Sequence, residues 1–220
     1  MPHIHANGLD IGYDVVGEGP PLLMLHGASS GGRLDFGHQL AQFRKEFTCY
    51  LPDARGHGAT RWSADDGFSY DWLVDDTLAF ADAVGLGAFG LLGFSMGGGT
   101  AMGVASRAPD RIATLVVMGI TPGASRASVA RRLFDADRIK RETPDWAAVL
   151  DRRHDPVQGD GGWERLLPAI GESIASQNLL GPGDIRQIDA PALVIAGDRD
   201  PFAPVDHVWG SSATCLTADS

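Results

Sequence analysis

A chain of 220 residues, 44% hydrophobic and 21% charged, has the length and composition of one globular domain with a sizeable core. Its formal net charge of −10 argues against nucleic acid and membranes as partners, because nucleic acids and anionic membranes bind basic surfaces. No apolar run approaches the length of a membrane span, and the first residues show no signal-peptide pattern, so we expect a cytoplasmic protein.

Strand-like and helical segments alternate along most of the chain. Strands are predicted for residues 3–6, 9–16, 22–25, 47–51, 89–93, 112–118 and 192–196. The Asn7-Gly8 pair predicts a hairpin turn between the first two strands, and continuous apolar runs such as 112–118 are typical of strands buried on both faces. The spacing of apolar residues predicts helices over 34–43 and 70–84.

This alternation predicts an α/β fold with a mostly parallel sheet and helices on both faces. Residues 121–189 break the rhythm, because they contain several short helical pieces, repeated prolines and no convincing strand. We interpret this segment as a small helical cap inserted above the strand ends. The core is then formed by residues 1–120 and 190–220.

The stretch from Phe89 to Arg107 carries the clearest motif. An apolar run ends at Gly93, Ser95 follows at the spacing G-x-S-x-G, and small residues after Gly97 read as a helix. A serine at such a strand-to-helix turn has a strained backbone and projects its hydroxyl above the sheet edge. The first helix amides point towards whatever that serine attacks. The pattern predicts that Ser95 is a nucleophile rather than part of a glycine-rich helix cap.

Other polar and glycine-rich sequences also follow predicted strands. His26-Gly27, Ile120 and Asp198/Asp200 all fall, like Ser95, at the carboxyl end of a strand. Ligands bind at these ends in open parallel sheets. The convergence of several motifs at one edge predicts a site there.

Four motifs together resemble the α/β-hydrolase fold family over nearly the whole chain. They are His26-Gly27, Asp53-Ala54-Arg55-Gly56-His57-Gly58, Gly93-Phe94-Ser95-Met96-Gly97 and Gly197-Asp198-Arg199-Asp200. The chain is most similar to small capped esterases and lactonases, including 3-oxoadipate enol-lactonase-like proteins, and cofactor-free haloperoxidases also look similar.

The resemblance implies roles for particular residues. Ser95 would attack an acyl carbon, and the backbone amides of Met96 and Ala28 would hold the oxyanion that develops. The family's spacing selects Asp200 as the acid of the triad and leaves Asp198 as the alternative. Asp53 and Arg55 are expected to pair with each other or with loop backbone, and His57 is expected to be structural.

A triad also needs a histidine that takes the serine proton. The family carries it after one more helix and one more strand, but only 20 residues follow Asp200, and they contain no apolar run suited to a buried strand. We therefore expect a C-terminally shortened fold without the last strand and its histidine loop. His207 is the remaining candidate base, and His154 in the cap and His38 are weaker ones.

The cap contains aromatic and basic residues that bear on the substrate. The substrate pocket is expected to involve His26, Gly27, Phe94, Trp62, Phe134 and Trp146. The aromatic residues, with Trp163, have the alternative role of holding the cap onto the sheet. The cap arginines are candidates for receiving an anionic substrate, and a solvated helical face is the other interpretation.

The leading functional hypothesis is a serine hydrolase that acts on small carboxylic esters or lactones through a Ser95 acyl-enzyme. We expect weak activity because the usual histidine is missing. The alternatives are a non-catalytic binding protein and a haloperoxidase or perhydrolase that uses the same site. We expect no cofactor and no metal, since no cluster has metal-ligand spacing. The exposed edge of the last strand is expected to be covered by the C-terminal tail or by a second copy of the chain in a homodimer.

Overall fold

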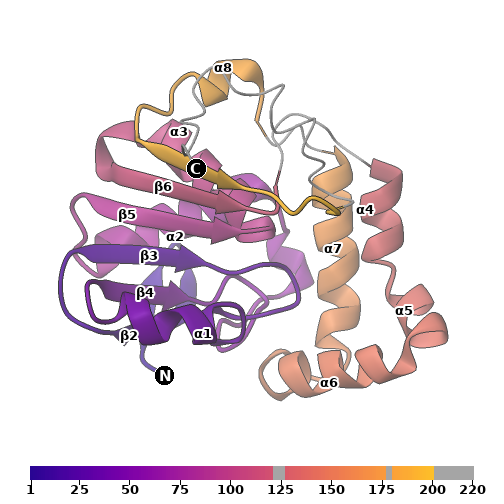
Figure 1. Cartoon of the computed structure of the whole chain (residues 1–220). Helices are drawn as coiled ribbons and strands as arrows, with labels where there is room; N and C mark the ends of the chain where they lie inside the picture. The colour runs from indigo at the N-terminus through magenta and orange to yellow at the C-terminus, as the bar shows by residue number, and fades with distance from the viewer. Residues whose placement is uncertain (121–126, 177–179, 201–220) are drawn as a thin grey trace.

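A seven-stranded sheet with the order β1-β2-β4-β3-β5-β6-β7 runs through the described part of the molecule (Figure 1). The computed structural model describes residues 1–120, 127–176 and 180–200. The strands are β1 (His3–Ala6), β2 (Leu9–Val16), β3 (Pro21–Leu25), β4 (Thr48–Pro52), β5 (Phe89–Phe94), β6 (Ile112–Met118) and β7 (Ala192–Ile195). Every predicted strand is present, with ends shifted by no more than one residue.

The strand pairing confirms the prediction of a mostly parallel sheet. β1 and β2 form an antiparallel hairpin whose turn residues Asn7 and Gly8 both have positive φ, 49° and 77°. β2 pairs antiparallel with β4, and the five strands from β4 to β7 in the sheet order run parallel. The carboxyl ends of these five strands therefore meet at one edge of the sheet.

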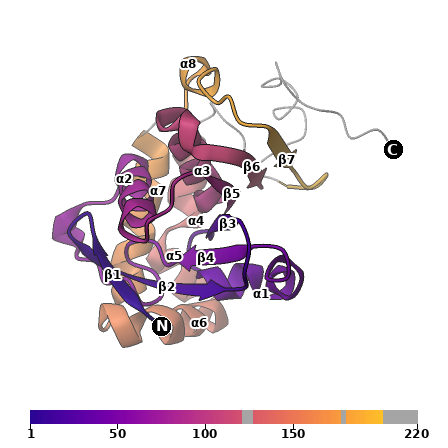
Figure 2. The ribbon, with the colours of Figure 1, turned by 90° about the vertical axis from the view of Figure 1, so that its left-hand side faces the viewer.

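Helices cover both faces of the sheet (Figure 2). One face carries α1 (Gly32–Phe43), and the other carries α2 (Tyr70–Ala83) and α3 (Met96–Arg107). Successive residues of β3 divide between the faces: Leu22 and Met24 pack with α1, whereas Leu23 and Leu25 pack with α2 and α3. This division explains the continuous apolar run of that strand.

Four helices form the cap beyond the carboxyl ends of the strands (Figure 1). They are α4 (Ala127–Leu133), α5 (Ala136–Glu142), α6 (Pro144–Gln158) and α7 (Gly162–Ser176). Their own core contains Leu150, Trp163, Leu166 and Ile170, all fully buried. The same cluster includes Tyr70 and Leu73 of α2, and apolar packing thereby joins the cap to the body.

The segment after the cap returns to the body earlier than its sequence indicates. The short helix α8 (Pro182–Ile185) contacts α3, and Leu180, Ile185 and Ile188 pack with the core under the sheet. These residues belong with the body by packing, although they fall within the predicted cap. Two single-turn 3₁₀ helices, η1 (Ala64–Asp66) and η2 (Pro109–Arg111), complete the described elements.

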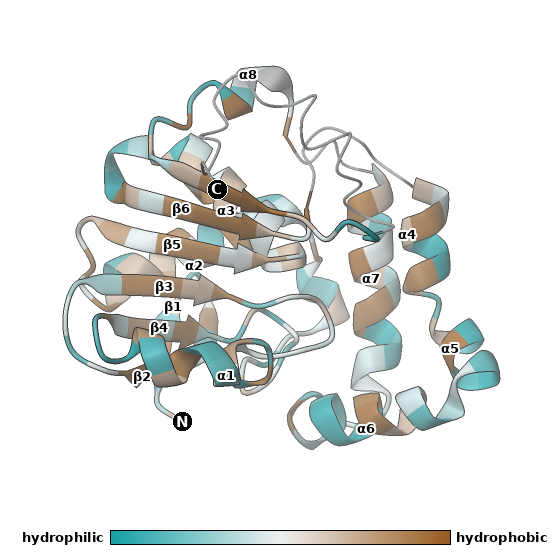
Figure 3. Ribbon diagram, in the orientation of Figure 1, coloured by the Kyte–Doolittle hydropathy of each residue, from teal (hydrophilic) through white to brown (hydrophobic). Residues whose placement is uncertain are grey.

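Within the described residues, β7 has β6 as its one neighbour and lies at the sheet edge, as predicted. Ala192 and Val194 pack against the core, but Leu193 and Ile195 on the other face are 51% and 44% exposed. β7 is brown in Figure 3 like the central strands, so its apolar character continues onto an exposed face. The homodimer expected at this edge stays a prediction. None of the helices described here has the length and hydrophobicity needed to cross a bilayer.

Candidate active site

Ser95 occupies the sharp turn between β5 and α3. Its φ of 52° and ψ of −115° lie outside the usual regions for a residue with a side chain, as expected for a nucleophile turn. A Cβ on Gly97 would collide with the Leu25 carbonyl, and one on Gly93 would collide with the Gly97 carbonyl. Glycine is therefore required at both positions for the strand and the helix to approach so closely.

Two residues predicted to form the oxyanion hole line the cavity together with Ser95. Met96 is the first residue of α3, and Ala28 belongs to residues 26–31 after β3, which we call the oxyanion loop. Among the described residues neither amide donates to another protein group, so both are available to a negatively charged oxygen.

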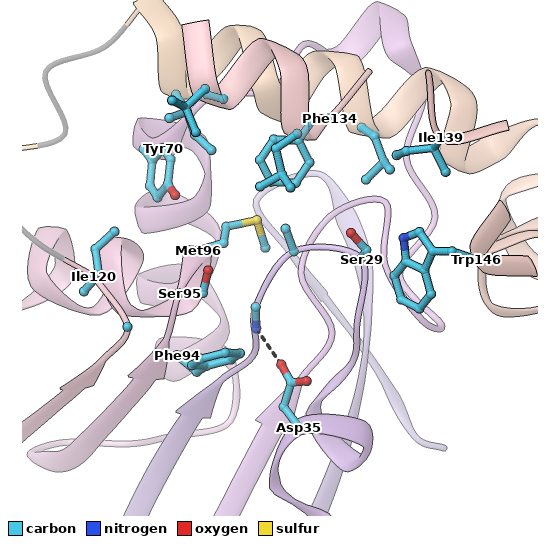
Figure 4. A pocket seen from close by; sticks show the side chains of 18 residues that line it. Ser29, Asp35, Tyr70, Phe94, Ser95, Met96, Ile120, Phe134, Ile139 and Trp146 are labelled. Atoms are coloured by element: carbon cyan, nitrogen blue, oxygen red, sulfur yellow. Dashed lines mark hydrogen bonds between the residues drawn. The ribbon is translucent and has the colours of Figure 1, made fainter. Parts of the chain in front are cut away.

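Asp35 of α1 fixes the oxyanion loop from one side. Its carboxylate accepts the Gly27 amide at 2.7 Å (Figure 4). The same carboxylate accepts the Ser30 hydroxyl at 2.5 Å. This arrangement uses the Gly27 amide inside the protein and leaves the Ala28 amide for the cavity. Sequence reasoning missed Asp35, although its place at the first turn of the helix after His26-Gly27 was a usable signal.

A cavity of about 410 Å³ lies between the strand ends and the cap. Ser95, Phe94 and Met96 form its sheet side, and the side chains of Phe134, Ile139 and Trp146 approach from the cap (Figure 4). The remaining lining residues are Gly27, Ala28, Ser29, Asp35, Tyr70, Gly119, Ile120, Val129, Ala130, Leu133, Leu167 and Ile174. The cavity is therefore a mainly apolar chamber with the candidate nucleophile on one wall.

The two candidate acids differ in their surroundings. Asp200 lies beside Gly119 of the cavity wall, since a Cβ on Gly119 would stand 3.6 Å from the Asp200 Oδ2 atom. The Asp198 side chain is 90% exposed and lies 3.9 Å from Arg199. Asp200 is therefore the candidate that lies near the cavity wall, and its role as the acid of the triad stays a prediction.

Comparison with known sequences decides the family. The sequence profile of the α/β-hydrolase fold matches residues 20–148, which is more than half of the chain. The chain belongs to the α/β-hydrolase fold family. It is 28% identical to the mouse serine hydrolase BPHL over 94% of this chain and 75% of that protein. It is 26% identical to 3-oxoadipate enol-lactonase 2 of Acinetobacter baylyi, over 99% of this chain and 91% of that protein.

A solved structure agrees with this assignment of the fold. The enol-lactonase of Burkholderia xenovorans superimposes on this chain with a TM-score of 0.74, at 24% identity. The match covers 96% of this chain and 86% of that one. The match supports the fold that the strand order and the sequence profile already indicate.

No histidine lines the cavity of this α/β hydrolase among the described residues. His154 is buried under the cap, His38 is exposed on α1, and His3 and His5 are exposed on β1. His207 lies outside the described residues. His154, a weaker candidate for the base, packs against His57 at 5.6 Å between ring centroids and does not line the cavity.

His26 is a backbone-bonding residue and not a cavity-lining one. It is 2% exposed, its Nδ1 atom lies 2.7 Å from the Gly27 carbonyl, and its Nε2 atom accepts the Ala54 amide at 3.0 Å. Its placement in the substrate pocket was therefore wrong, because these bonds hold the ring behind the oxyanion loop. Gly27, Phe94, Phe134 and Trp146 do line the cavity.

Trp62 was also predicted in the pocket and lies elsewhere. Its Nε1 atom donates to the Gly67 carbonyl at 2.8 Å, and its ring packs edge-on against Phe68. It contacts the cap core together with the fully buried Trp163. Both residues hold the cap onto the body, which is the alternative role that the sequence left open.

Charged side chains fix the position of the loop that follows β4. Asp53 and Arg55 do not pair with each other, but each bonds to loop backbone, which was the other expected arrangement: Asp53 to the Ala59 amide and Arg55 to the Gly67 carbonyl. Arg55 also forms a two-pronged, buried ion pair with Asp76 of α2 at 2.6 and 2.8 Å. A pair 21 residues apart carries no local signal, so the sequence alone did not reveal it.

Three basic residues of the cap form ion pairs at the surface, whereas Arg153 of α6 is half-buried and donates to the Ser29 carbonyl. Arg131 pairs with Glu172, Arg138 with Glu142, and Lys140 with Glu164. None of the cap arginines and lysines in the described part of the chain lines the cavity. The solvated-face interpretation of these charges is supported, and the anionic-substrate interpretation is not.

Proposed function

We propose that this chain hydrolyses small carboxylic esters or lactones through an acyl-enzyme on Ser95. One observation carries the proposal: Ser95 stands at a strained turn on the wall of a mainly apolar cavity that Ala28 and Met96 also line, and among the described residues neither of their amides donates to a protein group. The relatives support the same chemistry, since one is named a serine hydrolase and another an enol-lactonase.

In the proposed reaction the Ser95 Oγ atom attacks the acyl carbon, and the carbonyl oxygen becomes an oxyanion held by the Ala28 and Met96 amides. One such donor is worth about 10²–10³ in rate. The leaving alcohol departs, and water then releases the acid by the reverse sequence. Asp200 would orient and stabilise the histidine that carries the protons.

The identity of that base determines the rate. We propose His207 for this role, because the described histidines lie away from the cavity. Without a base, turnover falls by about 10⁶, while binding and the oxyanion hole retain about 10³–10⁴ over water. Weak activity is therefore the expected state of a chain in which no histidine reaches Ser95.

The lining indicates uncharged substrates. Asp35 is the single charged residue among the described residues that line the cavity, and its carboxylate disfavours a second negative charge nearby. The apolar side chains of the cap wall favour a hydrocarbon acyl or ring portion. We propose neutral esters and lactones rather than carboxylate-bearing ones.

Hydrolysis of p-nitrophenyl butyrate by the wild type, Ser95→Ala and His207→Ala tests the proposal. We expect Ser95→Ala to abolish catalysed release of nitrophenol and His207→Ala to reduce it at least a hundredfold. Ser63→Ala, at an exposed helix cap, is the control and should leave the rate unchanged. Equal rates in the wild type and Ser95→Ala would contradict the proposal and favour a non-catalytic binding protein.

A further inference from the structure

Two buried histidines join the oxyanion loop to the 53–60 loop in a reciprocal way. His26 of the first loop accepts the Ala54 amide of the second at 3.0 Å, and His57 of the second accepts the Ser29 amide of the first at 3.2 Å. Their rings lie 5.1 Å apart between centroids. Each loop thus supplies an imidazole to a backbone amide of the other.

The hydrogen bonds of His57 define its protonation state. Its Nδ1 atom lies 2.9 Å from the Arg55 carbonyl, which can only accept, so this nitrogen carries the proton. Its Nε2 atom must then hold a lone pair to accept the Ser29 amide. A protonated ring would place an N–H group against that amide and break the bond.

Ser29 needs this support because its backbone is strained. It has a φ of 60°, a left-handed conformation that is uncommon for residues other than glycine. It directly follows Ala28, and both residues line the cavity beside Ser95. A shift at Ser29 would therefore move the Ala28 donor.

The cap bonds to the carbonyl group of Ser29. Arg153 of α6 donates from Nη1 to the Ser29 carbonyl at 3.1 Å, and its guanidinium lies over the ring of Trp146, which lines the cavity. His154, the next residue of α6, is fully buried against His57. The main chain of Ser29 is thus bonded by the body through its amide and by the cap through its carbonyl.

The titratable and charged side chains that face these rings disfavour an additional proton, whereas nearby backbone groups favour one. His57 faces His26 and His154, and His154 also faces Arg153. The nearest acids are engaged elsewhere: Asp53 accepts backbone amides and Asp76 binds Arg55. Among the described residues no carboxylate bonds to the ring of His57 or His154.

The ring of His154 has both nitrogens buried without a hydrogen bond of ordinary geometry. Nearby carbonyls of Gly56 and Ser29 raise its pKa, but burial outweighs them and the pKa is lowered from 6.5. Burial, with the neighbouring imidazoles, also lowers the pKa of His57 well below 6.5. Both rings are therefore neutral in this structure, in which the cap covers them.

We propose that His57 is a positioning residue that holds the oxyanion loop through Ser29, and that it does so only as a neutral ring covered by the cap helix α6. The proposal rests on the proposed function, because it assigns the Ala28 amide to the oxyanion. Protonation of His57 releases Ser29 and misplaces that donor. The cap and the oxyanion hole are thereby coupled, and both are sensitive to acid.

The direction of the pH effect follows from the folded state. The unfolded chain binds a proton on this histidine near pH 6.5, whereas the folded chain resists it. The contribution of the neutral His57 ring to the free energy of unfolding is therefore complete above about pH 6.5. It is lost as the pH falls from there through the pKa of His57 in the folded chain. As the pH is lowered, the oxyanion loop should therefore loosen at a higher pH than the sheet does.

Two substitutions at His57 distinguish its role as a hydrogen-bond acceptor from the packing of its ring. His57→Phe keeps a ring between His26 and His154 but cannot accept the Ser29 amide. His57→Gln offers a neutral amide oxygen near the position of Nε2 at every pH. His38→Phe, on the exposed face of α1, is the matched control for loss of a histidine.

Hydrogen–deuterium exchange of amides 27–31, resolved at Ser29, gives a readout that needs no catalysis. We expect His57→Phe to speed exchange at Ser29 at least tenfold at pH 7, while His57→Gln and His38→Phe stay within about threefold of the wild type. Corrected for intrinsic exchange, protection in the wild type should fall between pH 7 and 5, and in His57→Gln it should not. Unchanged exchange at Ser29 in His57→Phe would overturn the proposal.

Kinetics complete the test. For p-nitrophenyl butyrate we expect His57→Phe to lower kcat at least tenfold with KM within about twofold, because the donor acts on the transition state. His57→Gln should restore most of kcat. If the wild type shows no Ser95-dependent hydrolysis, the proposed function fails, but the exchange data still decide the role of His57. A parallel rise in KM and exchange across the whole sheet would show a merely structural role.

Discussion

The two walls of the cavity are built by different kinds of interaction. The sheet wall depends on backbone: a strained serine, glycines that admit close main-chain contact, and amides positioned by buried side chains. The cap wall depends on apolar side chains that interlock around Trp163. Hydrogen bonds and close backbone contacts have strict geometry, whereas apolar packing accepts substitutes of similar volume.

This difference separates two tasks within one site. The sheet wall has to place a nucleophile and two donors to within a fraction of an ångström, and a misplacement of about 1 Å can cost a factor of 10² in rate. The cap wall has to enclose a substrate and exclude water. We therefore expect single-atom changes to be severe on the sheet wall and graded on the cap wall.

The largest effect is expected at the nucleophile turn. Gly97→Ala adds a methyl group that would meet the carbonyl groups of Leu25 and His26, and main chain cannot move aside without disrupting β3. We expect a loss of about 3 kcal/mol or more in the free energy of unfolding, measured by urea denaturation.

Gly37→Ala is the matched control for that change. Gly37 is an exposed helical residue whose added methyl would meet nothing within 4 Å. The substitution should stabilise the protein by about 0.5–1 kcal/mol, because alanine is the better helix former. Equal stability of the two variants would show that the turn is not as tightly packed as described.

On the cap wall, the effect is expected to depend on the volume that is removed. Leu167 is buried in the cap core and also lines the cavity. Leu167→Ala should cost about 2–5 kcal/mol and shift the preference among p-nitrophenyl esters towards longer acyl chains, since the cavity grows. Leu167→Met conserves volume, so it should cost less than about 1.5 kcal/mol and keep the preference of the wild type. An unaltered chain-length preference in Leu167→Ala would mean that substrate does not reach this wall.

The same contrast explains what the sequence could predict. The sheet and the Ser95 turn were predictable because their signals are local: apolar runs, glycines at fixed spacing and a hairpin pair. The pairing of Arg55 with Asp76 and the orientation of Trp62 were not, because each depends on which distant element arrives beside the residue. An aromatic residue predicts burial, but it does not specify which cavity its ring will face.

The smallest effect is expected for the charge on the sheet wall. Asp35→Asn retains an oxygen for the Gly27 amide while it removes the negative charge from the cavity lining. At a separation of about 8 Å and an effective dielectric constant of about 20–40, that charge opposes an anionic substrate by about 1–2 kcal/mol. The ratio of kcat/KM for mono-p-nitrophenyl succinate to that for p-nitrophenyl butyrate should therefore rise about fivefold to thirtyfold.

Asp110→Asn is the control for this change. It alters the net charge equally from an exposed turn at the opposite end of the sheet, and it should leave this ratio within about twofold. An equal ratio in Asp35→Asn and the wild type would place the substrate's charge away from Asp35 and remove the electrostatic argument for neutral substrates.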